Sequence, residues 1–87
     1  MIDLEKIDKL LQEAKGSDFI KAERVARMMG DPTPSIIFSA KFQAILLANL
    51  FGVPVEDIEE LPVHDFTVAI SKVNAFLFGQ GLEAAKS

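Results

Sequence analysis

Apolar residues recur at helical spacing along most of the chain. From residue 3 to residue 14 they are Leu4, Ile7, Leu10, Leu11 and Ala14, which share one face of a helix because residues three and four apart lie together. The corresponding stripes farther along are Phe19, Ala22, Val25, Ala26 and Met29, and then Val63, Phe66, Ile70, Val73 and Leu77. The spacing predicts helices over residues 3–14, 18–29 and 63–78.

A further helix is predicted over residues 39–51, with a different distribution of polar residues. After Ala40 only Lys41, Gln43 and Asn49 are polar, and a helical wheel spreads these three around the whole circumference. A helix that is apolar nearly all round must be buried on most sides or covered by another chain.

Capping residues mark the ends of these helices. Asp3, Ser17 and Ser39 are suitable N-caps because their side-chain oxygens can accept from free backbone N–H groups. Gly16 is expected to adopt the left-handed conformation just past the first helix.

Proline and glycine set the breaks between the helices. The segment 30–34, Gly-Asp-Pro-Thr-Pro, ends the second helix, and 52–54, Gly-Val-Pro, ends the third. Between the second break and Pro62, residues 55–60 can form one acidic helical turn. The short apolar run 36–38 is either extended or the opening of the next helix, since periodicity does not separate the two.

The fold class predicted from this pattern is all-α, a compact bundle of four helices with one short extra helical turn. One domain spans residues 1–87, with an ordered core of about 3–79 and a frayed tail at 80–87. The residues expected in the core are Leu10, Phe19, Ala26, Phe42, Leu46, Leu50, Phe66, Ile70 and Val73.

Composition excludes several classes of protein. The 87 residues include no cysteine and one histidine, so a disulfide framework or a thiolate metal site is impossible. The net charge of −4 argues against nucleic acid as a partner. No apolar run approaches the roughly 20 residues of a membrane span, so we expect no membrane partner. The mean hydropathy of +0.26 is high for a lone soluble domain and suggests a protein partner.

No residue pattern points to catalysis. Glu56, Asp57, Glu59 and Glu60 lack the spacing of a calcium loop and are expected to form a solvated acidic turn. His64 has no nucleophile motif beside it, and nucleotide-binding glycine motifs are missing from the sequence. We therefore expect no catalytic, cofactor-binding or metal-binding residue, and a protein that acts by binding.

One segment suggests DNA binding instead. Residues 42–58 resemble the first helix and turn of a helix-turn-helix, with Gly52 suited to the left-handed corner. The second helix would bring four carboxylates against the phosphate backbone and would end by Pro62. Both features disfavour DNA binding. A small helix-turn-helix-like transcriptional regulator is the alternative function, and salt-sensitive binding to duplex DNA would identify it.

The chain from Gly16 to Phe78 resembles phage tail assembly chaperones, which are encoded beside the tail-tube and tape-measure genes of long-tailed phages and prophages. The segments that carry the resemblance are 18–24, 30–35, 42–44, 52–58, 61–62, 65–66 and 76–77. The motif positions within them are Gly30, Asp31, Pro34, Phe42, Gln43, Gly52, Pro54, Asp65 and Phe66. Members of that family often begin with a short strand-like segment, whereas this chain begins directly with a predicted helix.

The resemblance implies a protein that binds the tape-measure protein and helps to recruit tail tube subunits during assembly. It also implies action in the cytoplasm of the bacterial host and absence from the mature virion. A chaperone of this kind needs apolar surface to cover an apolar, largely helical client.

Four residues are candidates for that protein-binding surface. Phe38 and Phe51 mark the ends of the third helix, and Val68 and Phe78 lie away from the apolar stripe of the last one. We expect these side chains to bind a helical client or a second copy of the chain, which makes a homo-oligomer possible.

Overall fold

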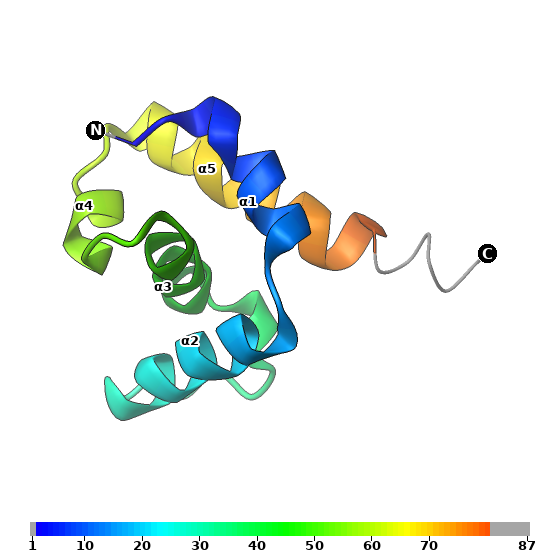
Figure 1. The fold of residues 1–87 in the computed structure, drawn as a ribbon. Helices are drawn as coiled ribbons and strands as arrows, with labels where there is room; N and C mark the ends of the chain where they lie inside the picture. The colour runs from blue at the N-terminus through cyan, green and yellow to red at the C-terminus, as the bar shows by residue number, and fades with distance from the viewer. Residues whose placement is uncertain (1, 81–87) are drawn as a thin grey trace.

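The computed structural model describes residues 2–80, and within them the chain forms only helices and connecting turns (Figure 1). The elements are η1 (Leu4–Lys6), α1 (Ile7–Glu13), α2 (Gly16–Met28), η2 (Ile36–Phe38), α3 (Ala40–Phe51), α4 (Val55–Glu59), α5 (Val63–Asn74) and η3, a π-helical segment (Ala75–Gln80). The all-α class and the bundle of four helices with one short extra turn are confirmed. Most of the predicted tail, residues 81–87, lies outside the described residues.

Helix α3 is the centre of the bundle. Figure 1 shows α2 on one side of it, α1 and α5 on the other, and α4 beside its C-terminal end, and each of these helices contacts α3. Seven consecutive residues, 42–48, are buried. The expectation that this helix is covered on most sides is therefore confirmed, and the polar Gln43 is buried with its apolar neighbours.

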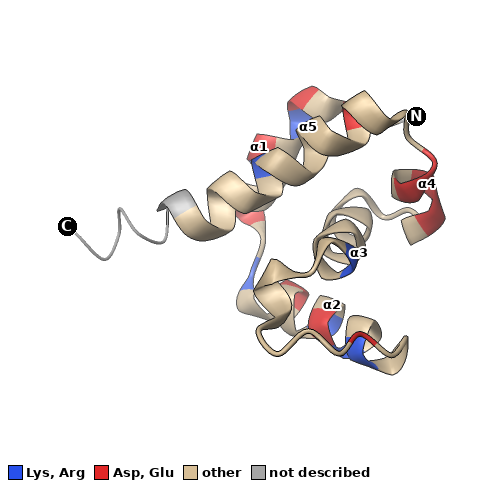
Figure 2. Ribbon diagram, turned by 180° about the vertical axis from the view of Figure 1, so that it is seen from behind, with Lys and Arg blue, Asp and Glu red and all other residues tan. Residues whose placement is uncertain are grey.

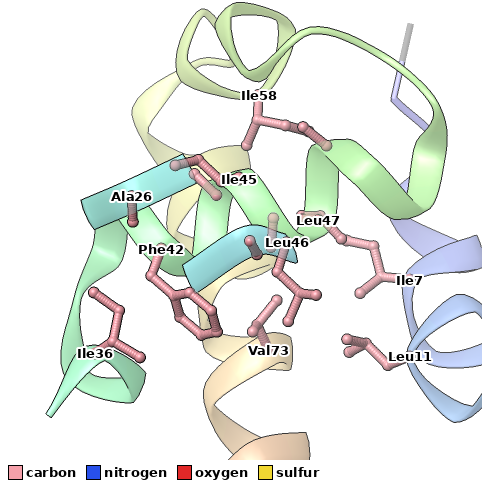
Figure 3. Close-up of a cluster of buried hydrophobic side chains, with 14 residues drawn as sticks. Ile7, Leu11, Ala26, Ile36, Phe42, Ile45, Leu46, Leu47, Ile58 and Val73 are labelled. Atoms are coloured by element: carbon pink, nitrogen blue, oxygen red, sulfur yellow. The ribbon is translucent and has the colours of Figure 1, made fainter. Parts of the chain in front are cut away.

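The core gathers side chains from all five α-helices. In Figure 3, Ile58 of α4 lies above α3, while Ile7 and Leu11 of α1 and Val73 of α5 approach it from other sides. Of the predicted core residues, Ala26, Phe42, Leu46 and Val73 are buried, whereas Phe19, Leu50, Phe66 and Ile70 are half-buried against the core and Leu10 is half-buried. The predicted stripes therefore lie on the correct faces of the helices, but the side chains at their edges are more exposed to solvent than expected.

The connection between α1 and α2 differs from the prediction. Helix α2 begins at Gly16, with Lys15 as the N-cap, so Ser17 lies inside the helix and does not cap it. The carboxylate of Asp18 accepts the backbone N–H of Lys15 at 2.8 Å, which satisfies a free donor and lets the helix begin earlier. Gly16 is not left-handed, because α1 ends in an extended residue, Ala14.

The glycines at the next two breaks behave as expected. Gly30 has φ of 89° and Gly52 has φ of 71°, and residues that carry a Cβ rarely adopt this backbone conformation. Gly52 closes α3 as a left-handed C-cap, and its N–H donates to the carbonyls of Ala48 and Asn49.

The loop from α2 to α3 is held by two charged side chains. The Arg27 guanidinium donates to the carbonyl oxygens of Asp31 at 3.0 Å, Thr33 at 2.6 Å and Pro34 at 3.3 Å. The Asp31 carboxylate accepts both the N–H and the hydroxyl of Thr33, at 2.9 and 2.6 Å. Two prolines leave this loop few backbone donors, so the side chains supply most of its hydrogen bonds.

Ser39 connects that loop to the central helix. Its hydroxyl donates to Asp31 and accepts the backbone N–H of Phe42 at 3.1 Å, which confirms Ser39 as the N-cap of α3. The hydrogen bond from Ser39, followed by those from Thr33, lowers the pKa of Asp31 from 3.8 to about 2.

Removing the Ser39 hydroxyl is expected to destabilise the fold. Ser39→Ala deletes the N-cap and leaves the Asp31 carboxylate without one of its donors, so the free energy of unfolding falls by about 1 kcal/mol or more. Urea denaturation followed by circular dichroism measures the change. Ser71→Ala, at an exposed position within α5, is the matched control, and equal midpoints for the two variants would contradict the role of Ser39.

Asp31 is expected to make stability depend on pH in the acid range. Because its pKa is lowered to about 2, the carboxylate stabilises the fold fully above its ordinary pKa and loses this contribution as the pH falls through about 2. The difference in urea midpoint between the wild type and Asp31→Asn should thus be larger at about pH 6 than at about pH 2. For Glu13→Gln, an exposed carboxyl-to-amide control, a small difference at both pH values is expected.

Candidate protein-binding surface

Two of the four predicted binding residues lie against each other. The rings of Phe38, from η2, and Phe78, from η3, are stacked with centroids 5.0 Å apart and planes inclined by 27°. Phe38 nevertheless remains 68% exposed. We refer to Phe38 and Phe78 together as the aromatic edge, a place where apolar ring surface meets solvent.

The other two candidates are not part of this edge. Phe51 is half-buried against the core at the end of α3, and Val68 is half-buried in α5. Phe51 is the last residue of α3, and Gly52–Pro54 then turns the chain into α4, which packs against α3, an arrangement that hydrophobic periodicity within one helix does not reveal. The four residues therefore do not form a single surface.

Gln43 positions the aromatic edge from inside the bundle. Its side chain is 2% exposed, and its Nε2 donates to the carbonyl of Ile37 at 2.8 Å and to Oδ1 of Asn74 at 2.9 Å. These two bonds join η2, which contains Phe38, to the end of α5, which precedes Phe78. Gln43 Oε1 has no hydrogen-bond partner among the described residues.

The remaining motif positions have structural roles in the core, at helix ends and in the loop before α3. Phe42 is fully buried and meets Phe19 edge to face, with ring centroids 4.8 Å apart. Pro54 is the N-cap of α4, Asp65 lies in the first turn of α5 and Phe66 packs against the core. Each of these residues has a structural role. In the loop, the carbonyl oxygens of Asp31 and Pro34 accept from the Arg27 guanidinium, and the backbone N–H of Gly30 donates to the Arg27 carbonyl at 3.0 Å.

Several exposed apolar residues were not expected from the sequence. Val25 and Met29 were assigned to the buried stripe of α2 and Val63 to that of α5, yet they are 39%, 52% and 83% exposed. Those assignments are wrong because the fully buried strip of each helix is narrow, Ala22 and Ala26 in α2 and Ala69 and Val73 in α5. Ile20 and Met28 are also exposed, and the helical wheel does signal this, since both lie opposite the alanines of α2.

Charges are distributed unevenly over the surface. Figure 2 shows carboxylates concentrated on α4, where Glu56, Asp57, Glu59 and the following Glu60 are all exposed. Glu59 forms an ion pair with Lys41 at 2.6 Å, and His64 is exposed.

Among residues 2–80, no three His, Asp or Glu side chains are placed to hold a metal ion. Nor does this part of the chain contain a helix of sufficient length and apolarity to cross a membrane.

The contributions of Gln43 and Asn74 to the free energy of unfolding are expected to be coupled. Gln43→Leu removes both hydrogen bonds and leaves the Ile37 carbonyl and Asn74 without their donor, lowering the free energy of unfolding by about 1–3 kcal/mol. Asn74→Leu in the same chain should restore part of the loss, because both polar partners are then absent. A double-mutant cycle by urea denaturation measures this coupling. Gln12→Leu, on the exposed side of α1, is the control, and strict additivity would contradict the link.

The chain matches no protein-family model, no curated protein and no solved structure.

Proposed function

We propose that this protein is a phage or prophage tail assembly chaperone. It binds the tape-measure protein, helps to recruit tail tube subunits in the cytoplasm of the bacterial host, and leaves before the virion matures. The proposal is supported by the motif resemblance from Gly16 to Phe78, in which the motif residue Gln43 joins η2 to the end of α5 beside the aromatic edge.

The observation that carries the proposal is the exposure of that edge. Isolated apolar residues are common on protein surfaces, but two stacked aromatic rings with one still 68% exposed form a larger apolar contact. A helical client could pack an apolar stripe against it, and each phenylalanine covered contributes about 1.5–3 kcal/mol.

The acidic character of the rest of the surface is compatible with this role. A net charge of −4 helps to keep a protein with exposed apolar groups soluble before it binds its client. The alternative, a helix-turn-helix-like regulator, would use α4 as its second helix, and α4 has five residues, three of them acidic. Charge and length at that position therefore favour a protein client over DNA.

The test is co-expression with the tape-measure protein of the same genome. Wild-type protein is expected to keep the tape-measure protein soluble and to co-purify with it. Phe38→Glu places a charge on the aromatic edge and should weaken this binding by roughly 10-fold to 100-fold. Isothermal titration or a pull-down series with the purified tape-measure protein measures the change.

Val63→Glu is the matched control, because it makes the same kind of change at an 83% exposed apolar residue at the start of α5. It should bind the tape-measure protein as the wild type does. Failure of the wild type to bind refutes the proposal, and salt-sensitive binding to duplex DNA would favour the regulator. Equal losses in Phe38→Glu and Val63→Glu would show that the edge is not the binding site.

A further inference from the structure

A second surface lies at the opposite end of α3 from the aromatic edge. Its first half is a hollow between α2 and the end of α3. The lining of this half includes Asp18, Lys21, Arg24, Val25, Asn49 and Val53. Its two cationic side chains are exposed, and the carboxylate of Asp18 is engaged by the backbone N–H of Lys15.

The second half adjoins the first at Val53, which lines both. It lies between the residues that precede η1, the end of α3 and the connection from α4 to α5. The lining of this half includes Ile2, Phe51, Val53, Asp57, Glu60 and Leu61. Here the floor is apolar and the charged side chains are carboxylates. We call the two halves together the bipolar groove.

Four charged side chains of the bipolar groove form no ion pair within the described part of the chain. The ion pairs formed by residues 2–80 are Lys41 with Glu59 and Lys72 with Asp8. Lys21 and Arg24 at one end and Asp57 and Glu60 at the other are therefore free to meet charges of another molecule.

We propose that the bipolar groove is the interface of a two-fold symmetric dimer of this chain. Rotation by 180° about an axis near Val53 places Lys21 and Arg24 against Asp57 and Glu60 of the partner subunit, and the reverse pairing follows from the symmetry. The apolar residues near the axis, Val53 and Phe51 among them, then cover each other.

A second copy fits this surface better than a partner of one charge. A uniformly acidic or basic partner would be attracted by one half of the groove and repelled by the other, whereas the groove is complementary to itself in the antiparallel orientation. A symmetric contact uses both halves of each copy at once, while a head-to-tail contact uses one half of each.

The proposal does not rest on the chaperone function. The aromatic edge lies at the N-terminal end of α3, beside η2, and the bipolar groove lies at its C-terminal end, so a dimer formed through the groove leaves both aromatic edges open. Loss of dimerisation and loss of client binding can thus be measured separately.

A charge-swap experiment tests the dimer. The double variants are Lys21→Glu with Arg24→Glu, and Asp57→Lys with Glu60→Lys, all at exposed positions. Each alone places like charges across the interface and should raise the dimer dissociation constant by at least about tenfold. Mixed in equal amounts, the two variants are complementary at both ends and should form a heterodimer. Sedimentation velocity at several concentrations, with circular dichroism to verify folding, measures these species.

Lys6→Glu with Lys9→Glu, which reverses two charges outside the groove, is the control and should dimerise as the wild type does. A wild type that stays monomeric at high concentration overturns the proposal, as does a dimer unaffected by either swap. Species that keep growing with concentration would indicate a head-to-tail chain and also overturn it. If a swapped variant fails to fold, Lys21→Gln with Arg24→Gln and Asp57→Asn with Glu60→Gln replace the pair. Both should then dimerise more weakly than the wild type, and unchanged dimerisation overturns the proposal.

Discussion

A helix that is apolar on every side stays in water only if other parts of the chain cover each of its faces, and α3 imposes this requirement on the whole molecule. Helix α2 meets one face, α1 and α5 meet another, and α4 folds back beside the C-terminal end. The connections on both sides of α3 have to turn the chain sharply to bring these elements into place. Arg27, Asp31 and Ser39 fix the first connection, and Gly52 fixes the second.

The helices and the burial of α3 were predictable because each depends on spacing within one segment. The exposure of Val25, Met29 and Val63 was not, since periodicity identifies the face of a helix but not the width of the neighbour that covers it. In α2 the two alanines, Ala22 and Ala26, allow close contact with α3 over a narrow strip only. Large side chains at the edges of that strip stay in solvent.

The candidate surfaces were predictable to a smaller extent. Phe38 was identified because it marks the start of the third predicted helix, and Phe78 because it lies away from the apolar stripe of the last one. Their stacking depends on the way Gln43 joins η2 to Asn74, a contact between residues distant in sequence. The bipolar groove was hidden for the same reason. Its cations belong to α2, its carboxylates to α4 and the following turn, and only the fold brings both to Val53.

The pairing of α1 with α5 brings the first and the last α-helix together, with Asp8 and Lys72 joined by an ion pair at 3.1 Å. Contacts among α2, α3 and α4 span neighbouring segments, whereas closure of α1 on α5 requires a loop of most of the chain and its larger entropic cost. During synthesis the segment from α2 to α4 can thus pack before α5 has left the ribosome. One face of α3 then stays exposed to solvent until α5 packs against it. A chain that terminates before α5 would leave this apolar face exposed and would tend to aggregate through it.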